Sequence, residues 1–257
     1  MTTATRSGSP RTLHVEHCMG TVFTVDVRDS GRWNEAIGEV VAWLHHVDAV
    51  FSTYKDDSDI SRLRRNELTV GDADPDVAVV LALCAEVEEE TDGFFTTSTG
   101  TELDPTGLVK GWAIERSSNL LRAHGSRNHA VNGGGDIQLA GQATPDQPWS
   151  IGISDPRDRS RVLATVGGRD FAIATSGVAE RGLHIMNPHT SEPANGLASI
   201  TVLGPSLTRV DAYATAAFAM GPGALRWIEA TPDLEALLVF PDGTSVLTEG
   251  FGGASTP

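Results

Sequence analysis

Cysteine, lysine and long apolar runs are all scarce in this 257-residue sequence. The two cysteines, Cys18 and Cys84, are too few for a disulfide framework and have no spacing typical of zinc ligands, so we expect a reducing compartment. Residues 1–11 lack the apolar core of a secretory signal, and the longest apolar stretch, residues 77–85, is too short to span a bilayer. The sequence therefore predicts a cytoplasmic protein.

Positive charge is also scarce. The chain has 19 Lys and Arg residues against 34 Asp and Glu residues, which gives a formal net charge of −15. Such a surface repels the phosphates of nucleic acids and of anionic membranes, so we exclude both as partners. If the protein binds a phosphorylated ligand, something other than net charge must hold it, and a divalent cation is the obvious candidate.

The hydrophobic spacing predicts one mixed α+β domain with largely antiparallel strands. Apolar residues recur three or four apart along residues 33–51 and 77–87, as is typical of amphipathic helices. A third helix is expected from about Gly107 to a stop at Gly125. Two further helices are expected at residues 208–220 and 224–229. The expected strands are short and separated by Gly, Pro and Asp: residues 13–28, 130–131, 137–139, 149–153, 161–166, 171–175, 198–203, 236–240 and 245–247.

We assign this domain to residues 13–250. A polar N-terminal tail, residues 1–12, is expected to be disordered, and residues 251–257 form a C-terminal tail. No Pro/Ser-rich linker and no internal repeat divides the chain.

Two oxygen-bearing residues lie one helical turn apart near the C-terminus of the domain. Asp211 and Thr215 are spaced i and i+4, so their side chains converge on one point. A carboxylate and a hydroxyl suit a hard cation such as Mg²⁺. The alternative is structural, because Asp is common at helix starts and a buried Thr often bonds a backbone carbonyl.

A segment rich in Pro and Gly, residues 103–112, leads into the third helix and contains one of the only two lysines, Lys110. Exposed backbone groups at a helix start favour anions, and an ammonium one turn into the helix can meet a phosphate or a flavin oxygen. The alternative is an ordinary turn with Lys110 in solvent.

The segment Asn132-Gly-Gly-Gly-Asp136 lies between two short apolar stretches. Three glycines allow a close approach of another backbone or a ligand, and Asp136 can anchor loop amides, although a plain hairpin turn fits equally well. The segment is not G-x-G-x-x-G, so a Rossmann site is rejected. Ser176 is not in a G-x-S-x-G turn, and this argues against a hydrolase triad formed with His184.

The order of these motifs resembles that of the ApbE family of FAD:protein FMN transferases, over roughly residues 13–223. The matching segments are Met19-Gly-Thr-Val-Phe23, Phe51-Ser-Thr-Tyr-Lys-Asp-Asp-Ser58, Asp104-x-x-Gly-x-x-Lys-Gly111, Asn132-Gly-Gly-Gly-Asp136, Ala174-Thr-Ser-Gly177, His184 with Asn187-Pro188, and Asp211-x-x-x-Thr215.

The resemblance implies an activity. The family cleaves the pyrophosphate of FAD and transfers FMN through a phosphoester to a Thr or Ser hydroxyl of an acceptor flavoprotein, with Mg²⁺ required and AMP released. It implies FAD contacts at Met19, Tyr54, Phe94, Phe95, Thr96, Asp104, Lys110, Ile185 and Met186. It implies metal ligands at Gly107 (by its carbonyl), Asp211 and Thr215. We expect Lys110 to neutralise phosphate charge and His184 to accept the proton of the attacking hydroxyl.

The sequence departs from the family pattern in two segments. Phe94-Phe95-Thr96 stands where Ala-Phe-Asp is usual, and His184-Ile-Met-Asn-Pro-His-Thr-Ser191 stands where His-Ile-Ile-Asp-Pro-Arg-Thr-Gly is usual. Two alternatives to the transferase remain, and these departures suggest the second of them. One is an FAD pyrophosphatase that releases FMN and AMP, and the other is a flavin-binding module without chemistry.

Overall fold

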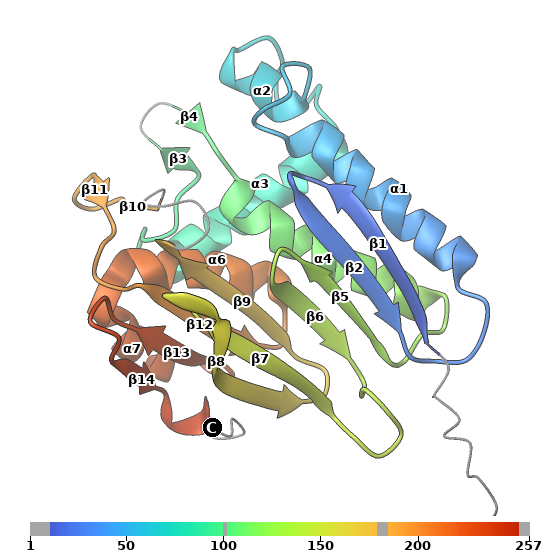
Figure 1. Cartoon of the computed structure of the whole chain (residues 1–257). Coiled ribbons are helices and arrows are strands. Elements are labelled where there is room, and N and C mark those ends of the chain that lie inside the picture. Colours follow the sequence, from blue (N-terminus) through green and yellow to red (C-terminus); the bar gives the residue numbers. More distant parts are fainter. Residues whose placement is uncertain (1–10, 100–101, 179–184, 252–257) are drawn as a thin grey trace, which may run out of the picture.

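An eight-stranded sheet lies at the centre of the molecule, and every neighbouring pair of its strands is antiparallel (Figure 1). The computed structural model describes residues 11–99, 102–178 and 185–251. In spatial order the strands are β1 (Thr12–Cys18), β2 (Thr21–Val27), β5 (His129–Gly133), β6 (Asp136–Ala140), β9 (Ala172–Gly177), β12 (Ser199–Gly204), β13 (Glu235–Val239) and β14 (Ser245–Leu247). This antiparallel α+β fold confirms the predicted fold class.

Helices cover one face of the sheet (Figure 1). The described helices are α1 (Asn34–Phe51), α2 (Asp59–Arg64), α3 (Pro75–Glu90), α4 (Thr106–Ala123), α6 (Leu207–Met220) and α7 (Ala224–Ala230), with the 3-10 turns η1 (Gly221–Gly223) and η2 (Glu249–Phe251). Of these, α2 lies beyond the sheet, against α1 and β4 (Glu102–Leu103), and η2 packs on the opposite side of the sheet. The predicted spacing explains most of this packing, because Ile37, Leu44 and Val47 of α1 are buried in the core, as expected. Val40 is buried in place of Val41, which is only partly buried.

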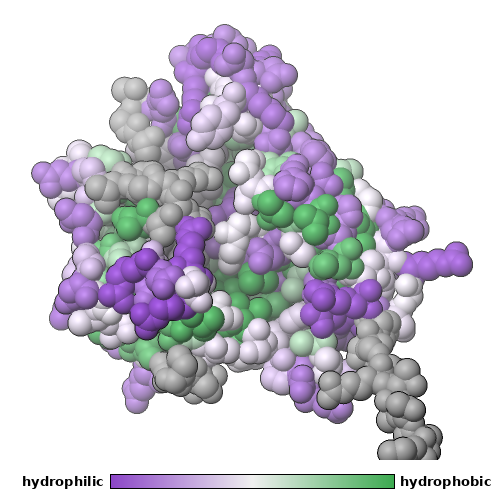
Figure 2. All heavy atoms as spheres, viewed as in Figure 1, coloured by the Kyte–Doolittle hydropathy of each residue, from purple (hydrophilic) through white to green (hydrophobic). Residues whose placement is uncertain are grey.

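A two-stranded hairpin covers part of the other face. It consists of β7 (Trp149–Asp155) and β8 (Asp158–Gly168). Strand residues alternate between the two faces, so Ala172 and Ala174 belong to the helix-side core while Ile173 packs with the hairpin. On β1, Leu13 and Val15 are exposed. Figure 2 shows an apolar surface over the β1–β2 part of the sheet.

Several short elements border the sheet. They are the paired strands β3 (Ser98–Thr99) and β4 (Glu102–Leu103), and the paired strands β10 (Met186–Asn187) and β11 (Glu192–Pro193). Sequence periodicity does not predict them, nor the six-residue α2, because each is too short to show a repeat. Hydrogen bonds define α2 instead, since the Ser58 hydroxyl accepts from the Ser61 N–H.

The predicted ends of the domain are only partly covered by the structure. Residues 1–10 and 252–257 of the two expected tails lie outside the described residues. Thr12 is already part of β1, and Phe251 is buried in the hairpin-side core. Among the described helices, none combines the length and the apolar character needed to cross a bilayer.

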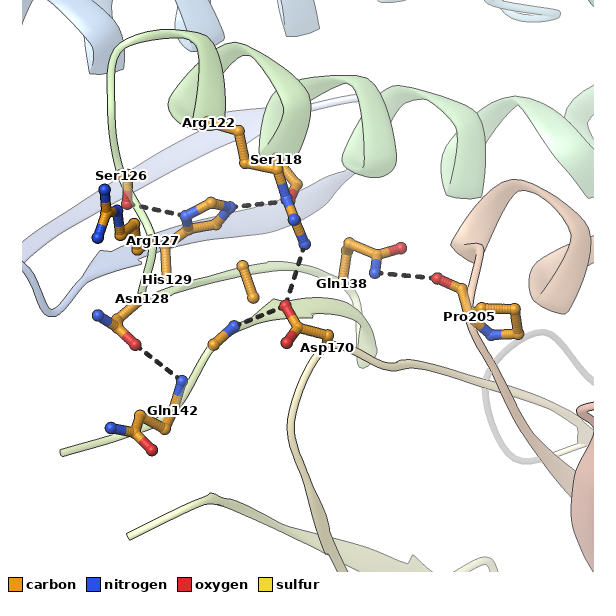
Figure 3. Close-up of polar contacts among 12 residues, drawn as sticks. Ser118, Arg122, Ser126, Arg127, Asn128, His129, Gln138, Gln142, Asp170 and Pro205 are labelled. Atoms are coloured by element: carbon orange, nitrogen blue, oxygen red, sulfur yellow. Dashed lines mark hydrogen bonds and ion pairs between the residues drawn. The ribbon is translucent and has the colours of Figure 1, made fainter. Parts of the chain in front are cut away.

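A buried histidine links the C-terminal part of α4 to the sheet (Figure 3). The His129 ring lies 2.8 Å from the Ser118 Oγ at its Nε2 and 2.8 Å from the Ser126 Oγ at its Nδ1. Because Ser126 donates its own proton to Asp29, His129 Nδ1 must be the donor to Ser126, and Nε2 accepts from Ser118. Burial, together with the positive charge of Arg122, lowers the pKa of His129 to about 4.

This buried histidine makes stability depend on pH. In the unfolded chain the pKa of a histidine is about 6.5, so between pH 6.5 and 4 the unfolded state binds more protons and the folded state loses stability. A difference of ~2.5 pKa units corresponds to ~3 kcal/mol lost as the pH falls from 7 to 4. Urea unfolding of His129→Gln at several pH values should show a flatter pH dependence by about that amount. The exposed His17→Gln should keep the wild-type slope, and equal slopes in all three proteins would contradict the assignment.

Candidate active site

The first half of α4 crosses α6 at unusually close range. A Cβ placed on Gly111 would lie 2.4 Å from the Leu207 carbonyl oxygen and 2.7 Å from the Asp211 Cβ. Only glycine fits this position, and its N–H donates to the Asp211 Oδ2 at 2.8 Å. In an α-helix that N–H ordinarily bonds the carbonyl four residues earlier, that of Gly107, so its bond to Asp211 competes with that pairing.

The two helices run antiparallel, and further contacts follow at intervals of one turn. On one side of Gly111, a Cβ on Gly107 would lie 3.7 Å from the Thr215 Oγ1. On the other side, the Glu115 carboxylate accepts from the Thr208 N–H at 2.8 Å and from its hydroxyl at 2.6 Å. Glu115 thus satisfies one orphan N–H group at the start of α6, while the Leu207 N–H donates to the Gln138 Oε1, and Glu115 aligns the two helices.

This crossing brings together the three residues predicted to bind metal: Gly107, Asp211 and Thr215. Asp211 and Thr215 lie one turn apart on α6, and the Thr215 hydroxyl donates to the Asp211 backbone carbonyl at 3.3 Å. The donor set consists of one carboxylate, one hydroxyl and one backbone carbonyl, all oxygen, around a buried acidic side chain. These donors fit Mg²⁺, which prefers oxygen ligands and keeps coordination positions for phosphate and water.

Lys110 lies at the same crossing. Its Nζ is 2.5 Å from the Asp136 Oδ2, and the Lys110 side chain is 29% exposed whereas that of Asp136 is 3% exposed. The sequence proposes Asp136 as an anchor for loop amides, but its Oδ1 accepts from the Thr175 N–H of strand β9 at 3.0 Å, and it is the Asn132 Oδ1 that accepts from the Gly135 N–H of the loop. Sequence reasoning missed the ion pair with Lys110, because 26 residues separate the two side chains.

Asp104 lies in the turn that leads into α4. Its Oδ1 accepts from the Thr106 N–H at 3.0 Å and from the Thr106 hydroxyl at 2.6 Å. Arg64 of α2 donates to the Leu103 carbonyl at 2.5 Å and places its Nη2 3.6 Å from the Asp104 Oδ2. Asp104 therefore has a structural role at the start of α4, and its contact with flavin stays a prediction.

Two of the predicted flavin contacts lie on turns. Met19 is in the β1–β2 turn at a φ of +51° and packs against the helix-side core. Tyr54 lies in the loop between α1 and α2 and is 90% exposed, so it does not form part of the core. In Figure 1 the β1–β2 turn, the β5–β6 turn and the two short strand pairs all lie along the upper side of the molecule.

The segment at residues 94–96 divides its side chains between core and surface. Phe95 is 2% exposed, and its ring lies 3.1 Å from where a Cβ on Gly107 would be, so it supports the crossing from within the core. Phe94 is only partly buried. The Thr96 hydroxyl accepts from the Ser98 N–H at 3.1 Å.

The β10–β11 pair carries the remaining predicted contacts. Ile185 is buried in the core, whereas Met186 is exposed. His184, the predicted base, lies outside the described residues. The His189 ring packs against Phe94 with ring centroids 4.3 Å apart, and its Nε2 donates to the Asp92 carbonyl at 3.0 Å. The two segments that depart from the family pattern therefore contact each other.

Comparison with known proteins identifies the family. The chain matches the model of the ApbE family over residues 19–101 and 95–238, and it belongs to that family. This confirms the resemblance found in the sequence.

The alignments with named relatives cover different shares of this chain. It is 34% identical over 129 residues to the FAD:protein FMN transferase of Vibrio cholerae, an alignment covering 46% of this chain and 39% of that protein. It is 29% identical over 234 residues to the FAD:protein FMN transferase of Rhodobacter capsulatus, covering 85% of this chain and 41% of that protein. The aligned region thus spans less than half the length of these relatives.

Solved structures share the fold. The flavin transferase ApbE from Vibrio cholerae superposes with a TM-score of 0.81 at 22% identity and covers 95% of this chain and 99% of its own. The ApbE protein from Thermotoga maritima superposes with a TM-score of 0.83 at 22% identity, over 95% of this chain and 98% of its own.

The close helix crossing predicts an unusual response to a Gly→Ala change. In a helix interior this change ordinarily stabilises by ~1 kcal/mol, but the Cβ of Gly111→Ala would collide with backbone of α6 and should destabilise by ~1–3 kcal/mol. Gly38→Ala in α1 is the matched control, because its Cβ would meet no described atom within 4 Å and should stabilise by ~0.5–1 kcal/mol. Urea unfolding gives the free energy of unfolding of both variants. An equal gain in stability for Gly111→Ala and Gly38→Ala would contradict the close crossing.

Proposed function

We propose that this protein is an FAD:protein FMN transferase. The observation that carries the proposal is the α4–α6 crossing, where Gly107, Asp211 and Thr215 offer an all-oxygen donor set and Lys110 lies on the same turn of α4 as Gly107. Family membership and the names of the relatives support it. A strongly acidic protein needs such a local arrangement to bind a pyrophosphate at all.

The proposed reaction exchanges one phosphate linkage for another. The oxygen of a Thr or Ser hydroxyl on the acceptor protein attacks the phosphorus on the FMN side of FAD. The bond from that phosphorus to the bridging oxygen breaks, and AMP leaves with that oxygen. When bound at the crossing, Mg²⁺ supplies charge neutralisation at the pyrophosphate. The Lys110 ammonium contributes a second positive charge from the protein itself.

The hydroxyl proton needs an acceptor, and we assign this role to His184, whose ordinary pKa of about 6.5 suits proton transfer near neutral pH. His184→Ala should then lower AMP release ~10²–10⁴-fold without changing FAD affinity. His45→Ala, on the exposed part of α1, is the control and should keep the wild-type rate. A normal rate in His184→Ala would remove this residue from the mechanism.

The remaining assignments concern the flavin and the acceptor. We propose that Met19, Tyr54, Phe94 and Met186 present apolar faces to the rings of FAD, with Asp104 and Thr96 as polar contacts. Phe95 and Ile185 would contribute from the core beneath them. The acceptor is a flavoprotein or a flavin-carrying domain, and the cytoplasmic location stays a prediction from the sequence.

Removing the charge of Asp211 tests the function. Asp211→Asn keeps the shape that accepts the Gly111 N–H but weakens metal binding, so AMP release from FAD should fall at least ~10²-fold. The measurement uses FAD with Mg²⁺ or with EDTA, alone or with a lysate of the host cell, and follows AMP and in-gel flavin fluorescence. Asp155→Asn, another buried carboxylate, on the β7–β8 hairpin, should behave as wild type.

Each outcome has a distinct meaning. AMP release together with a fluorescent protein band, both lost in EDTA, supports the transferase. AMP and free FMN without a labelled band indicate an FAD pyrophosphatase, and bound FAD without AMP indicates a binding module. Absence of FAD binding would overturn the proposal altogether.

A further inference from the structure

The glycine turn between β5 and β6 packs closely against strand β2. Its two central residues, Gly134 and Gly135, have φ values of +63° and +104°, in the left-handed region that favours glycine. A Cβ on the preceding Gly133 would lie 2.6 Å from the Phe23 ring. The turn therefore packs directly against β2, and this packing fixes where the next residue, Asp136, begins β6.

The carboxylate of Asp136 joins three elements of the fold. Its Oδ2 lies 2.5 Å from the Lys110 Nζ on α4, and its Oδ1 accepts from the Thr175 N–H on β9 at 3.0 Å. A carboxylate removed from water needs a cation and hydrogen-bond donors, and these two contacts provide both. In return, the ammonium of Lys110 is held at one place although it ends a flexible four-carbon chain.

The place where Lys110 is held is the proposed reaction site. Lys110 directly precedes Gly111, whose N–H bonds Asp211, and it lies three residues after Gly107. Lys110 therefore belongs to the turn of α4 that carries the Gly107 and Gly111 contacts with α6, and Asp136 holds its ammonium at that turn.

We propose that Asp136 is a positioning residue that aims the Lys110 ammonium at the pyrophosphate of FAD, an inference that rests on the proposed transferase function. Asp136 acts through Lys110. A mobile lysine still attracts an anionic substrate, but charge that develops during the reaction is stabilised best by a donor already in place. Removing Asp136 therefore lowers the turnover number kcat and spares FAD binding.

The central experiment compares two variants that each neutralise a buried carboxylate paired with a cation. Asp136→Asn releases Lys110, and the control Asp155→Asn releases Arg157, whose Nη2 lies 3.1 Å from Asp155 on the opposite face of the sheet. The kcat for AMP release is measured with FAD, Mg²⁺ and a fixed amount of host lysate, and the Kd for FAD by quenching of flavin fluorescence.

We expect Asp136→Asn to lower kcat ~10–100-fold while its Kd for FAD stays within ~3-fold of wild type. Asp155→Asn should leave both unchanged. A kcat within ~3-fold of wild type, or a rise in Kd that accounts for the whole loss, would overturn the proposal. Should Asp136→Asn fail to fold, Asp136→Glu is used instead, because it keeps the charge but moves it by one methylene. The same limits on kcat and on the Kd for FAD then decide the proposal.

A second measurement needs neither FAD nor an acceptor. Thermal unfolding is compared for Lys110→Met, Asp136→Asn and the double variant. Lys110→Met leaves a buried carboxylate without this cation, so it should lower Tm more than Asp136→Asn, and the double variant should regain part of the loss. Strictly additive losses would show that the pair does not hold Lys110, and would overturn the proposal.

The two measurements separate the two proposals. A wild-type protein that releases no AMP overturns the transferase function, and the positioning role falls with it even when the unfolding cycle shows strong coupling. A wild-type protein that releases AMP keeps the function, and the Asp136 variants then decide the positioning role alone.

Discussion

The register of α4 against α6 is the constraint on which the site depends. Gly107 faces Thr215, Gly111 faces Asp211 and Glu115 faces Thr208, so each turn of one helix meets a defined turn of the other. A slip by one turn, ~5.4 Å, would move Glu115 toward Asp211 and bring two carboxylates together in a buried interface. The glycine that permits the close approach and the glutamate that caps α6 together disfavour that slip.

The same crossing explains how an acidic chain can offer a site to an anionic substrate. With a net charge of −15 the surface as a whole repels phosphates, so attraction must be local. Two buried carboxylates lie close to this place, and each accepts a hydrogen bond from a backbone N–H: Asp211 from Gly111 and Asp136 from Thr175. These bonds hold the two acids in position; under the two proposals made above, Asp211 would bind a cation and Asp136 would orient Lys110.

The sequence predicted the parts of this arrangement that depend on local spacing. The helices over residues 33–51, 77–87 and 208–220 and the antiparallel strands follow from periodicity, and Asp211 and Thr215 follow from the i, i+4 rule. Contacts between distant segments could not be predicted in this way. Spacing does not show that Phe95 is buried beneath Gly107, or that His129 is neutral in the core, because both depend on neighbours brought in by the fold.

The two departures from the family pattern show what such distant contacts add. Asn187 accepts from the His189 N–H at 2.9 Å and donates through its Nδ2 to the Ala219 carbonyl at 3.2 Å, near the end of α6. The aspartate usual in the family could not make the second bond, since a carboxylate has no proton to donate. The ring of His189, in place of the usual arginine, packs against Phe94, in place of the usual alanine.

The substituted residues are thus matched to one another across 95 positions of sequence, between the loop after α3 and the β10–β11 pair. Here the new rings pack together and the new amide finds both a donor and an acceptor. These contacts tie the β10–β11 pair to α6 and to the loop after α3, so both substituted segments are held in the fold beside the candidate site.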